Sequence, residues 1–127
     1  MVRTNVRRQP MLHFNSRVVT RGAYTAQYAD AVAFRAGDEV AVDHPDSEFP
    51  EWFWCRGPDA REGWVHSSFL SHTSGRASGL RDYSAKELTV AAGESGRLIE
   101  LLGGWAYVEL DDGRCGWLPA QVIDAAV

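Results

Sequence analysis

Apolar and polar residues alternate through two stretches of the chain, and each stretch predicts a β-hairpin. In residues 103–122 (GGWAYVELDDGRCGWLPAQV), the alternation over 105–110 predicts a strand with one face toward a core. An Asp-Asp-Gly turn follows, and a second strand ends at Pro119. Residues 51–70 (EWFWCRGPDAREGWVHSSFL) repeat this plan. The chain is therefore organised around a duplicated hairpin that carries tryptophans.

A second repeated pattern precedes each hairpin. Residues 31–42 (AVAFRAGDEVAV) and 87–100 (ELTVAAGESGRLIE) each contain a sharp turn of glycine and an acid between short apolar stretches. Short strands with turn signals between them predict an all-β fold, in a small barrel or sandwich. The pattern places in the core Phe34, Val40, Val90, Leu98, Val108 and Leu118.

The polar stretch 73–76 separates the two copies. We expect a tail or arm over 1–17, a first domain over 18–72 and a second domain over 77–125. Each domain would then have about 50 residues, a size at which a hydrophobic core gives only marginal stability.

The order of these motifs resembles the Src homology 3 (SH3) family, twice in tandem. The second copy reads GLRDY, ELTVAAGE, GGWAYVEL and GWLPAQV, and the first reads RGAYTA, AVAFRAGDEV, EWFWCRG and GWVHSSF. The resemblance implies two tandem SH3-like five-stranded β-barrels that act as non-catalytic binding modules. Members of the family typically hold extended, proline-rich peptides in a shallow aromatic groove. We therefore expect a protein or proline-containing peptide as the partner.

Carried over by position, the groove of the family predicts eight ligand-binding residues. Strand alternation places Trp64 and Trp117 on the outer face, where they could widen the same groove or form the interface between the domains. An exposed indole offers a proline ring a large apolar surface and an N–H donor. The candidates are Tyr24, Asp30, Trp52, Trp64, His66, Phe69, Tyr83, Trp105, Trp117 and Pro119.

The two grooves differ in how closely they follow the family. The second copy has Arg81 and Val122 where the family has tyrosines, and its first loop is short. The first copy has His66 in place of the groove proline, but it keeps a full-length loop that bears Asp30. We expect the first groove to be the better peptide site.

Two other functions remain open. The aromatic faces could serve a structural role, by pairing the two domains or two chains in a homo-oligomer. Alternatively, a small ligand could bind between the barrels, because pockets favour domain interfaces. Solvent exposure of the repeated tryptophans separates these functions. An accessible groove favours ligand binding, whereas indoles buried between the barrels favour assembly.

Composition narrows the classes of function. The formal net charge of −4 argues against general nucleic-acid binding, and no apolar run is long enough to span a membrane. Two cysteines are too few for a disulfide framework, and the four histidines lack the spacing of a metal site. The sequence has no nucleophile–base motif and no phosphate loop. We expect a cytoplasmic protein that is not an enzyme and has no cofactor or metal.

The first 17 residues contain four arginines and no acidic residue. This composition is typical of a tail or surface arm. A second interpretation starts from the stretch Arg7-Arg8-Gln9-Pro10, because some peptide-binding modules recognise arginine beside proline. In that case the tail docks on one of the chain's own domains.

Overall fold

The strands of the computed structural model, which describes residues 14–28 and 31–126, form three antiparallel sheets. One sheet has the order β10-β9-β8-β1-β11, a second has the order β5-β4-β3-β6, and the short strands β2 and β7 form a pair. The described residues contain no α-helix, only the 3-10 turns η2 (Ser67–Phe69) and η3 (Ala120–Val122). The prediction of an all-β fold is confirmed.

The strand bounds follow the chain from its first described residues to its last. They are β1 (Arg17–Thr20), β2 (Ala33–Phe34), β3 (Glu39–Pro45), β4 (Trp52–Arg56), β5 (Glu62–His66), β6 (Gly75–Ser78), β7 (Tyr83–Ser84), β8 (Ser95–Leu102), β9 (Trp105–Leu110), β10 (Cys115–Pro119) and β11 (Ile123–Ala125). Both predicted hairpins are present, as β4–β5 and as β9–β10.

The strand pairing places one structural unit inside the other. β6 pairs with β3, and β7 pairs with β2, so these pairs lie within residues 31–85. β1 instead pairs with β8 and β11, which follow that segment in the chain. We call residues 31–85 the insert unit, and residues 14–28 together with 86–126 the split unit. The pairing therefore cuts across the expected division at residues 73–76.

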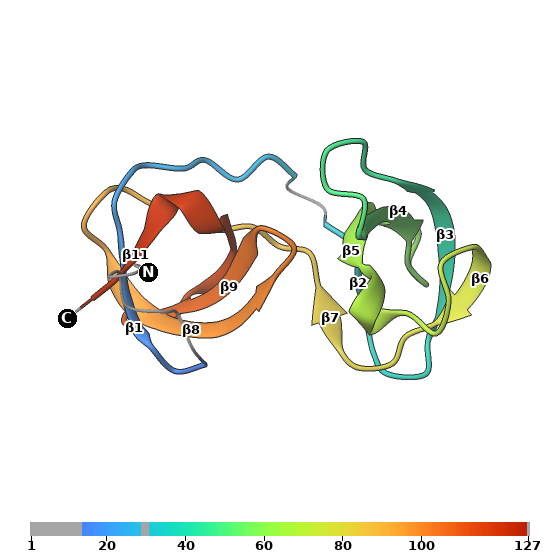
Figure 1. The fold of residues 1–127 in the computed structure, drawn as a ribbon. Coiled ribbons are helices and arrows are strands. Elements are labelled where there is room, and N and C mark those ends of the chain that lie inside the picture. Colours follow the sequence, from blue (N-terminus) through green and yellow to red (C-terminus); the bar gives the residue numbers. More distant parts are fainter. Residues whose placement is uncertain (1–13, 29–30, 127) are drawn as a thin grey trace, which may run out of the picture.

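Figure 1 shows the two units side by side, with the insert unit on the right and the split unit on the left. Both described ends of the chain lie on the split unit. Each unit contains a three-stranded meander, a 3-10 turn after it, and a further strand beside the first strand of the meander. In the insert unit that further strand is β6, and in the split unit it is β1.

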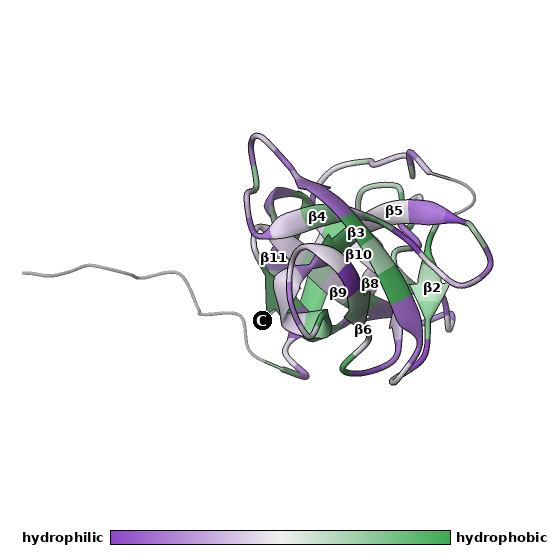
Figure 2. Ribbon diagram, turned by 90° about the vertical axis from the view of Figure 1, so that its right-hand side faces the viewer, coloured by the Kyte–Doolittle hydropathy of each residue, from purple (hydrophilic) through white to green (hydrophobic). Residues whose placement is uncertain are grey.

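Each unit surrounds a cluster of buried apolar side chains. Along β9 the residues alternate between half-buried and buried, as the sequence pattern predicts. All six predicted core residues are buried, and this prediction is confirmed. Figure 2 looks onto the insert unit, where β3 carries both hydrophobic and hydrophilic positions. Trp117 of the split unit belongs to the buried cluster of the insert unit, so the two units share apolar contacts.

Candidate binding cleft

A cleft of about 670 Å³ lies between the two units. The insert unit contributes β4, β5 and the loop before β4, and the split unit contributes β9, β10 and the segment that follows β1. Seven of the ten candidate residues line it: Tyr24, Trp52, Trp64, Tyr83, Trp105, Trp117 and Pro119. Candidates that the sequence assigned to two separate grooves thus lie in one cleft.

Two tryptophans form the floor of the cleft. Trp52 is 5% exposed and Trp117 is 4% exposed, and their ring centroids lie 5.4 Å apart with the rings nearly perpendicular. Both indole N–H groups already have acceptors, because Trp52 donates to Gly103 O at 3.1 Å and Trp117 donates to Ser84 O at 2.9 Å. The expectation of exposed indoles is wrong for these two residues. They hold the units together from the inside.

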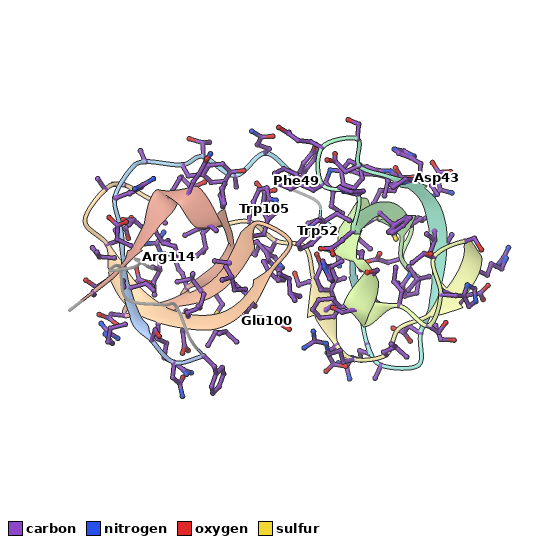
Figure 3. The ribbon with its side chains drawn as sticks, in the orientation of Figure 1. Asp43, Phe49, Trp52, Glu100, Trp105 and Arg114 are labelled. Carbon is purple, nitrogen blue, oxygen red and sulfur yellow. The ribbon has the colours of Figure 1, made fainter. Side chains whose placement is uncertain are left out.

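Half-buried aromatic rings form the walls. Trp105 stands on the split unit, and its ring contacts Tyr24 edge-on at 6.3 Å between centroids. Trp64 stands on the insert unit beside Trp54, at 5.1 Å between centroids. Figure 3 shows Trp105 opposite Trp52, with Phe49 beside them. These walls leave apolar surface open to a ligand.

A glycine turn of the split unit contacts the insert unit at one end of the cleft. Gly103 and Gly104 both have positive φ angles, of 50° and 87°. A Cβ atom on Gly103 would lie 2.5 Å from Nε1 of Trp52, and one on Gly104 would lie 3.0 Å from Cε1 of Phe49. The turn therefore needs glycine for its backbone conformation and for its close approach to the other unit.

The charged groups in the lining are all acidic. Asp46 and Glu48 belong to the insert unit, and Glu87 belongs to the split unit. Asp46 Oδ2 accepts hydrogen bonds from the backbone N–H groups of Glu48 and Phe49, which fixes the loop. No arginine, lysine or histidine is among the described residues that line the cleft. The cleft therefore favours a cation.

Two hydrogen bonds hold the Glu87 carboxylate in the cleft. Its Oε1 accepts hydrogen bonds from the Tyr24 hydroxyl at 2.7 Å and from the Gln27 N–H at 3.1 Å. Burial, and then the hydrogen bond and charge of Glu87, raise the pKa of Tyr24 well above its usual value. The phenol therefore stays protonated and donates to Glu87 at neutral pH.

Glu87 differs from the other half-buried glutamates of the described chain. Each of the others pairs with an arginine, as Glu62 with Arg56, Glu94 with Arg114, Glu100 with Arg81 and Glu109 with Arg97. Among the described residues Glu87 forms no ion pair, and both of its hydrogen bonds use Oε1. Sequence reasoning missed Glu87, although it opens the ELTV motif and directly precedes the buried Leu88.

His66 lies beneath the cleft rather than in its lining. Its Nδ1 accepts a hydrogen bond from the Ser68 N–H, so Nε2 carries the hydrogen and points to Glu51 Oε1 at 3.3 Å. The imidazole packs edge-on against Trp52, with 5.2 Å between centroids. His66 thus caps η2 and supports the floor.

The remaining candidates lie elsewhere. Phe69 is buried and lines a second cleft of about 740 Å³, where the Arg81 guanidinium stacks over its ring at 3.9 Å and pairs with Glu100. Asp30 lies outside the described residues. In the part of the chain that the structure describes, no group of three His, Cys, Asp or Glu side chains is arranged to hold a metal ion.

No protein-family model matches the chain, and no curated protein matches it. Within the described residues, no helix has the length and apolar character to cross a membrane.

Proposed function

We propose that the chain is a non-catalytic, SH3-like binding module that holds an extended, proline-containing and arginine-bearing segment of a partner protein. The order of the motifs supports the SH3-like assignment. The similar construction of the two units also supports this assignment, because each unit combines a meander, a 3-10 turn and an adjoining strand. In this proposal the ligand occupies the cleft between the units instead of a separate groove on each.

One observation carries the proposal: no arginine lies beside Glu87 among the residues that the structure describes. A half-buried carboxylate loses part of its hydration and gains from a cationic partner, and the chain supplies one to each comparable glutamate. Among the described residues, those that line the cleft in front of Glu87 include several aromatic rings and no basic side chain. A guanidinium group from a ligand can fill this place by donating to Oε2.

The chain contains an arrangement of the same kind. Arg81 stacks on Phe69 and reaches Glu100 Oε2 at 2.6 Å, which combines an aromatic contact with a charged hydrogen bond. Glu87 with Tyr24 and Trp105 offers the same two contacts to an arginine from outside. Arginine suits such a site better than lysine, because its planar group can stack and donate at once.

The apolar part of the ligand would lie along the aromatic walls. Proline rings pack well on indole and phenol surfaces, and an extended segment is already close to its bound conformation. Trp64, Trp105 and Pro119 provide that surface. The buried Trp52 and Trp117 would have the structural role that the sequence left open, by joining the two units of one chain.

A titration followed by NMR tests the proposal. The ligand is a synthetic proline-containing decapeptide with one central arginine. We expect a Kd in the micromolar range, about −8 kcal/mol or weaker, as is common for small shallow sites. The indole signals of Trp64 and Trp105 should shift together, because each unit supplies one wall.

The test variant is Glu87→Gln, and its matched control is Glu94→Gln. Glu87→Gln should weaken binding about tenfold, whereas Glu94→Gln changes a glutamate that already pairs with Arg114 and should leave the affinity close to that of the wild type. Shifts confined to one unit, or equal binding by both variants, would contradict the proposal.

A further inference from the structure

The chain itself contains a segment with the properties of the proposed ligand, namely arginines and a proline. Residues 1–13 lie outside the described part of the chain and include Arg3, Arg7 and Arg8 but no acidic residue. The rest of the chain then has 10 basic and 17 acidic residues, which gives a formal net charge of −7. Arg8 stands two residues before Pro10, so this segment combines positive charge with a proline.

Most arginines of the described chain are not available to the cleft. Eight of the nine form ion pairs with carboxylates, and the ninth, Arg35, lines the second cleft. Glu87 and the loop with Asp46 and Glu48 remain without an arginine among the described residues. The charges of the N-terminal segment and of the cleft are therefore complementary.

The segment is long enough to reach the end of the cleft at Gly104 from Asn15, the second described residue. The Asn15 N–H donates to Leu98 O at 2.7 Å, beside the middle of β8. Six residues further along, β8 leads into the turn at Gly104, which lines the cleft, so the distance is about 20 Å along the strand. Arg8 lies seven positions before Asn15 in the sequence, and seven extended residues can span about 24 Å.

We propose that the segment Arg7-Arg8-Gln9-Pro10 occupies the cleft of its own chain, with one arginine on Glu87, and excludes partner peptides. This inference rests on the proposed function of the cleft. The consequence is autoinhibition, since a partner must displace the segment before it binds. A short tether gives an effective concentration in the millimolar range. Against a Kd of about 0.1 mM, that concentration lowers the apparent affinity of a competitor about tenfold.

The test uses the full chain with Arg7→Ala and Arg8→Ala together, and the control carries Arg3→Ala and Thr4→Ala. The probe is a synthetic peptide of residues 5–12, titrated while the Trp105 indole signal is followed by NMR. The Arg7/Arg8 variant should bind the probe about tenfold more tightly than the wild type, and the control should match the wild type. Before any probe is added, the Trp105 signal of the variant should already differ from that of the wild type.

Equal binding by wild type and variant would overturn the inference. If wild type and the Arg7/Arg8 variant bound the probe equally but Glu87→Gln abolished binding, the proposed function would stand. Only the occupancy of the cleft by the chain's own segment would then be contradicted. Absence of probe binding to any form would overturn both. A wild-type dimer that dissociates on dilution and is lost in the Arg7/Arg8 variant would place the segment in a second copy, which contradicts occupancy within one chain.

Discussion

The insert unit and the split unit repeat the same motifs, but the chain supplies their strands differently. The insert unit takes β2 to β7 from one continuous stretch. The split unit places β1 between β8 and β11, although residues 31–85 intervene in the chain. An internal strand of its sheet is therefore its most distant strand in sequence. The comparison shows that a repeat in sequence need not coincide with a unit of strand pairing.

The units also contribute different chemistry to the cleft. The insert unit supplies Trp52, Trp64 and the loop that carries Asp46, whereas the split unit supplies Glu87 and Trp105. Neither unit alone has both the carboxylate without an arginine and the full set of aromatic walls. In the proposed function, binding depends on how the units dock as well as on how each folds.

The largest expected effect comes from cutting the chain at different places. Residues 31–85 should fold when made alone, because their strand pairs are internal. Residues 86–127 should stay unfolded until a peptide of residues 14–28 is added, because the sheet then lacks β1 and the buried Val18. The dispersion of amide NMR signals measures folding in each case. A fragment of residues 77–127 that folds without the peptide would restore the division at residues 73–76.

A smaller but still large effect is expected where a glycine allows close approach. A Cβ on Gly116 would lie 2.9 Å from both Leu88 Cγ and Lys86 O, so Gly116→Val should destabilise the chain by about 3 kcal/mol or more. The counterpart Gly63 has more room, since a Cβ there would lie 3.1 Å from Val32 Cγ1, and Gly63→Val should cost less. Urea denaturation checks both. A wild-type midpoint for Gly116→Val would count against the packing described for β10.

The contact between the units is tested by Gly103→Ala. The added methyl group would force the Trp52 indole away, and we expect about a tenfold loss of affinity for the arginine peptide while both units stay folded. Gly113→Ala is the control, because Gly113 also has a positive φ but a Cβ there would meet no atom within 4 Å. Isothermal titration and amide spectra measure both variants. Equal affinities of the two variants for the arginine peptide would mean that the position of the Trp52 indole does not affect binding.

The smallest expected effect is a response to acid at β1. Its Arg17 holds the pKa of Asp111 below the usual range through a hydrogen bond and opposite charge. Because the folded pKa is the lower one, this pair stabilises the split unit above the unfolded value of about 3.9 and is lost as the pH falls through the folded pKa. Hydrogen exchange at Val18 should quicken over that range in the wild type, and less so in Asp111→Asn.

The insert unit offers a comparison for this response. Arg61 also lowers the pKa of Asp59, through backbone and side-chain hydrogen bonds, but the two residues lie in one turn. Loss of that pair should leave exchange at Val40 unchanged. A similar acid response at Val18 and Val40 would show that the Arg17–Asp111 pair has no special part in holding β1.

The sequence was informative where the structure depends on neighbouring residues. Alternation predicted both hairpins and the buried positions. The partner of β1 could not be predicted in this way, because β1 and β6 have similar positions in the two repeats and only non-local pairing distinguishes them.

The candidate site shows the same limit. Motif order identified the aromatic residues but assigned them to two grooves, since it carried no information on how the units dock. Burial of Trp52 and Trp117 depends on the contact between the units. Glu87 became a candidate only when the arginine partners of the other half-buried glutamates were known.

The central claim is that a ligand arginine reaches Glu87, and a double-mutant cycle tests it directly. Calorimetric titration would combine wild type and Glu87→Gln with two decapeptides that differ only in arginine or glutamine at the centre. We predict a coupling free energy of about 1.4 kcal/mol, because Glu87→Gln should weaken binding of the arginine peptide about tenfold and leave binding of the glutamine peptide unchanged. Additive effects, with a coupling near zero, would show that the arginine binds elsewhere or contributes nothing, and would contradict the account.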